Sequence, residues 1–350
     1  MSIVVAAERT QPKHQSRDRC LLLCGVLIAL LILAVFCSLG LGAVALKPAR
    51  LWAALLRAGD AHASDIIILW DLRLPRAVLA ALVGGGLAAA GAAFQGLFRN
   101  PLADPFVIGA SSGAALGATL AISFGVGAVA LGFGPVPLSA FAGALLAVAV
   151  VFVIAETGGA TSVGSLLLAG SALSAIFTAI VSFLLIWQEQ PWFHVFSWLL
   201  GGFSGRSWGH LQIAAPYLVL GIGVLWLMSR PLDAMTNGDE IARSLGLSLR
   251  KTRFLIVGAA SLIVAAAVAV SGIIGFVGLI APHIARWLVG AGHARLIPVS
   301  ALLGAILLVL ADIVARTVVA PIEVPVGIVT SALGGPFFLY LLKTRGGRLA

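Results

Sequence analysis

The chain has 350 residues, of which 61% are hydrophobic and 10% are charged, and its mean hydropathy is +1.11. A soluble domain of this composition would expose an extensive apolar surface, so the sequence excludes that class and predicts a polytopic membrane protein. The formal net charge is +9. The basic residues lie between apolar runs and form no amphipathic stripe with aromatic residues, which excludes nucleic acid as a partner.

Apolar runs predict the transmembrane helices. A hydrocarbon core about 30 Å thick needs about 20 apolar residues per helix, which leaves room for about ten spans. We predict an all-α fold with spans at 20–46, 74–98, 106–126, 137–155, 163–187, 209–229, 252–272, 276–290, 296–316 and 325–343. Most Lys and Arg residues then face the cytoplasm if both termini do, as the positive-inside bias requires.

One transmembrane domain is expected over residues 20–343, between cytoplasmic tails at 1–19 and 344–350. It contains a weak internal repeat, because the block from Leu82 to Gly113 resembles the block from Val257 to Gly290. Each block is an apolar helix, a Gly-rich break with a proline turn and a new helix. By the span count the two blocks run in opposite directions, which is typical of inverted repeats in transporters.

Two other classes, an intramembrane protease and an ion-coupled carrier, are alternatives to a passive transport subunit. Gly109-Ala-Ser-Ser-Gly113 has the spelling of a nucleophile elbow, and His283 lies on another span, which is the pattern of an intramembrane serine protease. An elbow needs a strand-to-helix turn, whereas this serine pair lies in a Gly/Ala-rich helix. An ion-coupled carrier would be expected to hold carboxylates near the bilayer centre, but the acidic residues fall near span ends.

The chain lacks the signature of an ATPase. None of its lysines, Lys13, Lys47, Lys251 and Lys343, follows a glycine as a phosphate-binding loop requires. We therefore expect a transport subunit that is not itself an enzyme.

The segment after the sixth span predicts a short helix. Asn237 is expected to cap it, Ile241 and Leu245 to share one face, and Gly246 to end it, with a second helix starting at Ser248. Such a segment on the cytoplasmic side is either a docking surface for a soluble partner or a solvated connector.

Several motifs, in order along the chain, resemble those of the FecCD-type permeases, the membrane subunits of type II ABC importers for ferric siderophores, haem and cobalamin. The motifs are Arg73-Leu-Pro-Arg76, Asn100-Pro-Leu-Ala-Asp-Pro105, Ala242-Arg-Ser-Leu-Gly246, Gly275-Phe-Val-Gly-Leu-Ile-Ala-Pro-His283, Ala311-Asp-Ile-Val-Ala-Arg316, Glu323-Val-Pro-Val-Gly327 and Gly334-Gly-Pro-Phe337.

The resemblance implies a type II importer permease fold in the bacterial inner membrane, surrounded by lipid. It implies two copies of an ATPase subunit beneath the permease, which bind ATP and Mg²⁺, and a periplasmic or lipid-anchored substrate-binding protein above it. A second permease copy is implied as well, with spans five and ten lining a central path. No cofactor is expected on this chain.

The resemblance also assigns roles to individual residues. It implies docking of the binding protein at Arg73, Arg76 and Arg316. It places a cytoplasmic gate at Asn100, Leu102, Thr161 and Ser162, although the spacing after Thr161 departs from the family pattern. It matches residues 237–253 to the ATPase-coupling segment, with contacts from Asp239, Ile241, Ala242, Arg243, Leu245 and Gly246.

The substrate expected from the resemblance is an iron chelate. Haem is placed slightly ahead of a ferric siderophore, because Gly96-Leu-Phe-Arg-Asn-Pro101 and Gly334-Gly-Pro-Phe-Phe338 look most like haem permeases. Cobalamin is the alternative.

Overall fold

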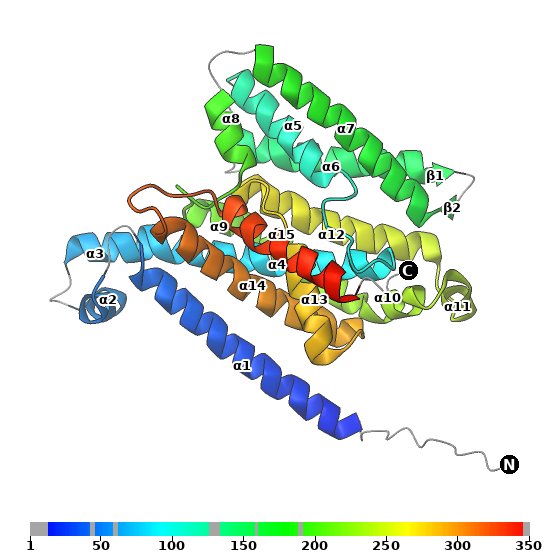
Figure 1. The fold of residues 1–350 in the computed structure, drawn as a ribbon, viewed down its shortest axis with the longest axis horizontal. Coiled ribbons are helices and arrows are strands. Elements are labelled where there is room, and N and C mark those ends of the chain that lie inside the picture. Colours follow the sequence, from blue (N-terminus) through cyan, green and yellow to red (C-terminus); the bar gives the residue numbers. More distant parts are fainter. Residues whose placement is uncertain are drawn as a thin grey trace.

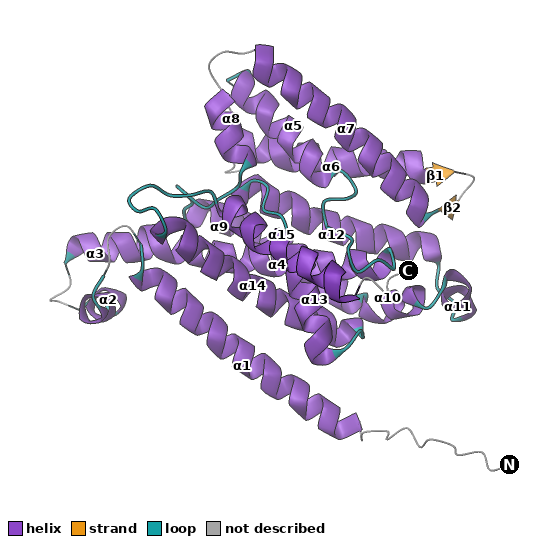
Figure 2. Ribbon diagram, viewed as in Figure 1, coloured by secondary structure: helices purple, strands orange, loops and turns teal. Residues whose placement is uncertain are grey.

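The protein is a bundle of helices, and a computed structural model describes residues 13–42, 46–58, 62–125, 134–157, 160–187 and 192–345. The long or apolar helices (Figure 1) are α1 (Lys13–Gly40), α4 (Leu74–Leu97), α5 (Ala110–Ser123), α6 (Pro135–Ala155), α7 (Val163–Trp187), α9 (Trp208–Leu227), α12 (Leu249–Ser271), α13 (Val277–Val289), α14 (His293–Thr317) and α15 (Val326–Arg345). Shorter elements are α2 (Pro48–Leu55), α3 (Ala63–Ile67), the π-helical turn η1 (Ile68–Arg73), α8 (Trp192–Leu199), α10 (Ser229–Thr236), α11 (Asp239–Ser244), and the strands β1 (Glu156–Thr157) and β2 (Ala160–Thr161). Figure 2 shows that helices make up nearly all of the described fold.

Each predicted span corresponds to one of these helices, so the all-helical polytopic fold is confirmed. Within the described residues, seven helical stretches are long and apolar enough to cross a membrane, one of them continuous from α3 through α4. The remaining predicted spans are shorter apolar helices, Ala110–Ser123, Val277–Val289 and Val326–Leu341.

Two helices start at other residues than the predicted spans. α1 begins at Lys13, because Lys, Arg and Gln continue a helix readily, whereas its apolar stretch begins at Arg19, next to the predicted start of the span at residue 20. α5 begins at Ala110 rather than at 106, because the preceding residues form turns. Gly109, with φ of 84°, has the left-handed conformation that glycine adopts readily, and the helix starts directly after it.

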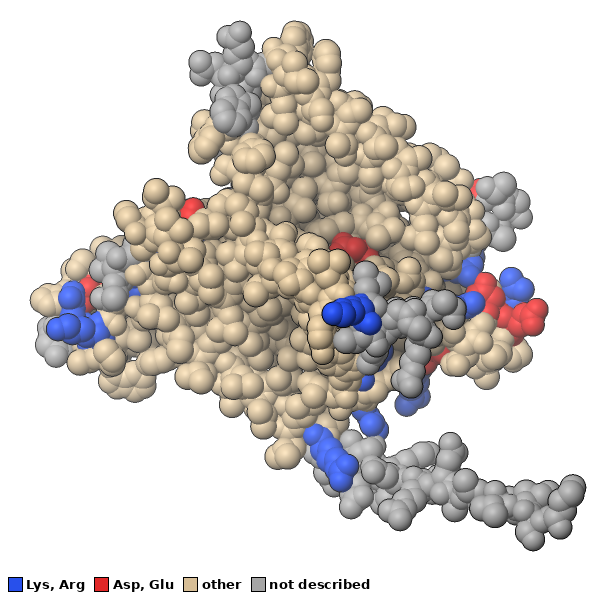
Figure 3. Space-filling view, viewed as in Figure 1, with Lys and Arg blue, Asp and Glu red and all other residues tan. Residues whose placement is uncertain are grey.

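The bundle has two polar ends. We call the end that carries α2, α3 and η1 the α3 end, and the opposite end, with α10 and α11, the α11 end (Figure 1). α1 starts and α15 ends toward the α11 end. Figure 3 shows that charged side chains on the visible face lie mainly toward the two ends, with both signs around α11. An apolar middle between charged ends is expected of a chain that spans a bilayer.

The internal repeat is visible in helix lengths and packing. The helices α4 to α7 have 24, 14, 21 and 25 residues, and α12 to α15 have 23, 13, 25 and 20. α4 packs against α13 and α14 of the other half, while α12 packs against α5 and α6. Because α4 starts at the α3 end and α12 at the α11 end, this reciprocal packing is that of two inverted halves.

Glycines bring α4 into backbone contact with its neighbours. A Cβ atom added to Gly84 would lie 2.3 Å from the carbonyl oxygen of Gly304 in α14, and one added to Gly91 would lie 1.9 Å from that of Gly278 in α13. Lipid is as apolar as the helix surfaces, so close backbone approach and van der Waals contact drive helix association. α4 is therefore held at the centre of the bundle, where it is buried from Val83 to Leu97.

We predict that Gly91→Ala destabilises the protein by about 1–3 kcal/mol, because the methyl group forces α4 and α13 apart. The matched control is Gly258→Ala in α12, where an added Cβ meets nothing within 4 Å. Thermal unfolding of the purified protein in detergent measures both variants. Equal unfolding temperatures for the two would contradict the close contact.

Candidate functional site

Buried charges join α4 and α14 at the α3 end. The side chain of Asp312 in α14 is 1% exposed. Arg76 of α4 donates to it from Nη2 at 2.8 Å, and the Nε atom of Arg316 lies 3.1 Å from its other oxygen. Arg76 also donates from Nη1 to Glu323 at 2.9 Å. Since a buried ion is costly unless it is paired, the two arginines and Asp312 depend on one another.

Glu323 connects this network to a second loop. Its side chain, 36% exposed, accepts a hydrogen bond from the Ser204 hydroxyl as well as from Arg76. Burial opposes ionisation, but these bonds and the nearby positive charge hold the pKa of Glu323 below its ordinary value. The ionised carboxylate therefore ties residues 204 and 323 to the start of α4.

The three predicted docking arginines lie at this end and are largely buried. Arg73 is 7% exposed and Arg316 5%. Arg73 donates to the carbonyl oxygen of Leu39 at 2.6 Å, and Arg316 donates to the Ser38 hydroxyl at 2.6 Å. Cations favour the C-terminal end of a helix, so both residues attach the end of α1 to the bundle. Their docking role stays a prediction.

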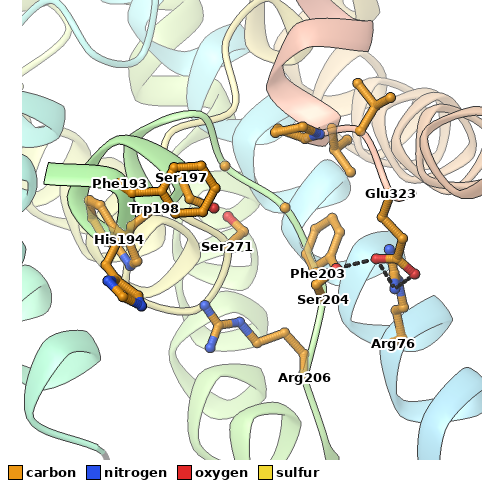
Figure 4. A pocket seen from close by; sticks show the side chains of 15 residues that line it. Arg76, Phe193, His194, Ser197, Trp198, Phe203, Ser204, Arg206, Ser271 and Glu323 are labelled. Carbon is orange, nitrogen blue, oxygen red and sulfur yellow. Dashed lines mark hydrogen bonds and ion pairs between the residues drawn. The ribbon is translucent and has the colours of Figure 1, made fainter. Parts of the chain in front are cut away.

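Two cavities flank the Arg76–Glu323 pair. The α8 cavity (Figure 4), of about 270 Å³, is bounded by α8, residues 201–206 and the start of α15. The arginine cavity has a volume of about 320 Å³. Its charged lining residues are Arg73, Arg76, Arg206, Arg316 and Glu323. Arg76, Arg206 and Glu323 border both cavities.

Arg206 is a candidate that the sequence reasoning missed. Its Nη1 donates to Nε2 of His210 at 3.3 Å, whereas its buried Nε has no partner within the described residues. Burial lowers the pKa of the Arg206 guanidinium from its ordinary value. The sequence holds a faint signal for it, because Arg206 is the single charged residue in the segment Gly201–Trp208.

At the α11 end, one carboxylate binds arginines from two helical regions. Asp239, the first residue of α11, accepts from Arg99 at 2.7 Å and from Arg253 at 2.6 Å. Arg99 lies in the turn after α4, and Arg253 lies in α12. Burial opposes ionisation, but Arg253 and then Arg99 hold the pKa of Asp239 below its ordinary value.

The predicted coupling segment forms α11 and the start of α12. Ile241 and Leu245 are 49% and 65% exposed, whereas Ala242 is fully buried. Arg243 is exposed, and Gly246, with φ of 80°, ends the helix as predicted. α11 therefore presents two apolar side chains to its surroundings, and its coupling role stays a prediction.

The predicted cap of α11 was wrong. The side-chain amide of Asn237 donates to the carbonyl oxygen of Asp233 in α10 at 2.8 Å, so it stabilises the preceding helix. Gly238 takes the N-cap position with φ of 129°. Glycine adopts this backbone conformation readily because it has no Cβ atom, whereas asparagine would be strained there.

The predicted gate residues occupy two neighbouring turns. Oδ1 of Asn100 accepts from the Leu102 amide at 2.9 Å, and Leu102 is 36% exposed. The Ser162 hydroxyl accepts from the Ser165 amide at 2.9 Å and so caps α7. Thr161 pairs with Glu156 in the β1–β2 pair, and its side chain lies outside the described residues.

A cavity of about 260 Å³ brings Ser162 together with Arg99 and Asp239. Asn100 and Leu102 do not line it. The structure thus places one predicted gate residue beside the Asp239 network, and gating itself stays a prediction.

The serine motif lacks the geometry of a nucleophile elbow. A turn, not a strand, precedes α5, and the Ser112 hydroxyl donates to the Gly109 carbonyl at 2.9 Å and lies 3.0 Å from the Ser174 hydroxyl. The ring of His283 packs against Trp287, with centroids 4.8 Å apart. Across the described residues, no group of three His, Cys, Asp or Glu side chains is placed to hold a metal ion.

The inverted halves, the apolar middle and the charged networks at both ends are those of a polytopic membrane protein. The model of the FecCD transport family matches residues 30–344. The chain belongs to this family, and it is a permease subunit of an ABC transporter of the importer type.

Two relatives and one solved structure illustrate the similarity. The cobalamin import system permease protein BtuC of Halobacterium salinarum is 44% identical over 84% of this chain and 78% of its own. The hemin transport system permease protein HmuU of Yersinia pestis is 39% identical over 92% and 95%. A structure described as an inward-facing conformation of a metal-chelate type ABC transporter has a TM-score of 0.81 at 34% identity, covering 92% of this chain and 98% of that one.

We predict that Asp312→Asn lowers the free energy of unfolding by about 3–5 kcal/mol, because it leaves Arg76 and Arg316 buried against a neutral amide. Glu323→Gln is the matched control, with an expected loss of at most about 1 kcal/mol, because that carboxylate is partly solvated. Thermal unfolding in detergent gives the comparison. An equal loss in both variants would show that Asp312 is not the centre of the network.

Asp104, in the turn between α4 and α5, gives a pH-dependent prediction. Burial raises its pKa to about 6, although its carboxylate accepts from the Phe106 amide at 2.8 Å. Because the folded-state pKa lies above the unfolded value, this group favours the fold below the unfolded pKa, and that contribution is lost as the pH rises through about 6.

Asp104→Asn should therefore raise the unfolding temperature by a few degrees at pH 8, with the difference from wild type vanishing near pH 4. The control is Asp71→Asn, at an exposed position of η1, measured over the same pH range. A benefit of Asp104→Asn that is independent of pH would contradict a buried carboxyl group that ionises near pH 6.

Proposed function

We propose that the chain moves a metal chelate across the bacterial inner membrane by alternating access, driven by a separate ATPase subunit with ATP and Mg²⁺. The family match over residues 30–344 is the observation that carries this proposal. An iron chelate, haem or a ferric siderophore, is the favoured cargo. The relative named for hemin supports haem, and the relative named for cobalamin supports a corrinoid as the alternative.

In the proposed orientation the α11 end, with both termini, faces the cytoplasm and the α3 end faces outward. Its support is the positive-inside bias. Arg230, Arg250 and Lys251 all lie on α10 and the start of α12, close to α11.

The ATPase docks on α11. Ile241 and Leu245 are exposed apolar side chains of this segment. The hydrogen bonds of Asp239 with Arg99 and Arg253 hold the start of α11 in place. A rigidly attached apolar patch at the cytoplasmic end fits a groove in a soluble partner. Two ATPase copies are required, because the permease pairs with a second copy of itself around a path lined by α7 and α15.

The substrate-binding protein docks at the α3 end. Arg73, Arg76 and Arg316 supply positive charge there, and an acidic side chain of the partner reaches them through the arginine cavity. Charge complementarity of this kind speeds and orients docking more than it tightens it.

Leu245→Asp tests the ATPase contact. We expect ATP-driven uptake into proteoliposomes and co-purification of the ATPase to fall at least about tenfold, because a charge is placed in an apolar contact. Leu56→Asp is the control, since Leu56 is 64% exposed at the α3 end.

The control variant should retain the bound ATPase, and both variants should insert normally. Normal coupling in Leu245→Asp would refute the docking surface. Concentrative uptake by the wild-type permease without any ATPase would refute the proposed function as a whole.

A further inference from the structure

Arg206 differs from the other arginines at the α3 end. Arg76 and Arg316 are paired with Asp312 and Glu323, and Arg73 donates to carbonyl oxygens of α1. Arg206 has no carboxylate partner among the described residues. Its side-chain hydrogen bond is to His210, and because a guanidinium only donates, Nε2 of the imidazole must accept as part of a neutral ring.

A partly buried cation with an unsatisfied Nε is costly unless an anion compensates it. Glu323, the carboxylate that borders the same two cavities, is already held by Arg76 and Ser204. Figure 4 shows the Arg206 guanidinium extending into the α8 cavity, away from the Arg76–Glu323 pair. Because Arg206 lines this cavity, an anion bound in the cavity would lie beside the guanidinium.

The wall of the α8 cavity opposite Arg206 is largely aromatic. Phe193 and Trp198 of α8 line it together with His194, and Phe203 closes the side toward the arginine cavity. A flat or apolar organic body packs well against such a wall, while a guanidinium binds a carboxylate in a fork. The combination fits a molecule with an apolar body and a carboxylate.

We propose that the α8 cavity is a substrate subsite in which Arg206 binds a carboxylate group of the transported chelate. This inference rests on the proposed function and narrows its cargo to carboxylate-bearing chelates. A small-molecule ligand is favoured over an acidic side chain of a docked protein, because the aromatic wall needs an apolar body beside the anion.

The test measures binding of haemin and of ferric dicitrate to the full-length permease with its ATPase in nanodiscs, without a binding protein. We expect wild type to bind at least one of them and Arg206→Gln to bind it about 10–100-fold more weakly, with a smaller loss for Arg206→Lys. Arg57→Gln, an exposed arginine of the same end, should bind like wild type.

A ligand control needs no variant. If haemin is the probe that binds, haemin dimethyl ester should bind wild type as weakly as haemin binds Arg206→Gln, and for either probe added salt should weaken wild-type binding. The proposal is overturned if neither carboxylate probe binds wild type, if Arg206→Gln binds as tightly as wild type, or if the ester binds as well as haemin.

Separate results would refute the proposed subsite and the proposed transport function. Normal ATP-driven uptake with binding that is indifferent to Arg206 would remove the subsite and leave the transport function. Binding that depends on Arg206, without any ATP-driven uptake, would remove the transport function and leave the subsite.

Discussion

Backbone contact along α4 is the constraint on which the rest of the structure depends. A helix in lipid gains little from hiding apolar side chains, so α4 is held by glycines that touch Gly304 and Gly278 directly. The same helix carries Arg76 in its first turn and Arg99 just after its end. The charged networks at the two ends are therefore positioned by one closely packed helix.

Compensation of charge explains what each network does. Asp312 is shared by two arginines, and Asp239 by two others, so each carboxylate joins segments that are distant in sequence. Buried ions are retained in such arrangements when every partner is present. Arg206 stands apart because no carboxylate among the described residues pairs with it, and the proposed subsite rests on that difference.

The helices could be predicted from the sequence because each is an apolar run ended by charge, proline or glycine. The three docking arginines and the coupling segment also lie at opposite ends of the bundle, as the span count predicts. The pairings could not be predicted, because Arg76 and Glu323 are separated by 247 positions and nothing in their spacing links them. The predicted cap of α11 was wrong for a local reason. Asn237 and Gly238 are adjacent in sequence, and the backbone conformation at the N-cap favours the glycine.

The attachment of α11 has a mechanical consequence. Asp239, its first residue, binds Arg99, which follows α4 of the first half, and Arg253, which lies on α12 of the second half. A force applied to α11 is therefore transmitted through Asp239 to both halves of the bundle. Because the two inverted halves share this contact, a movement of α11 displaces both of them together.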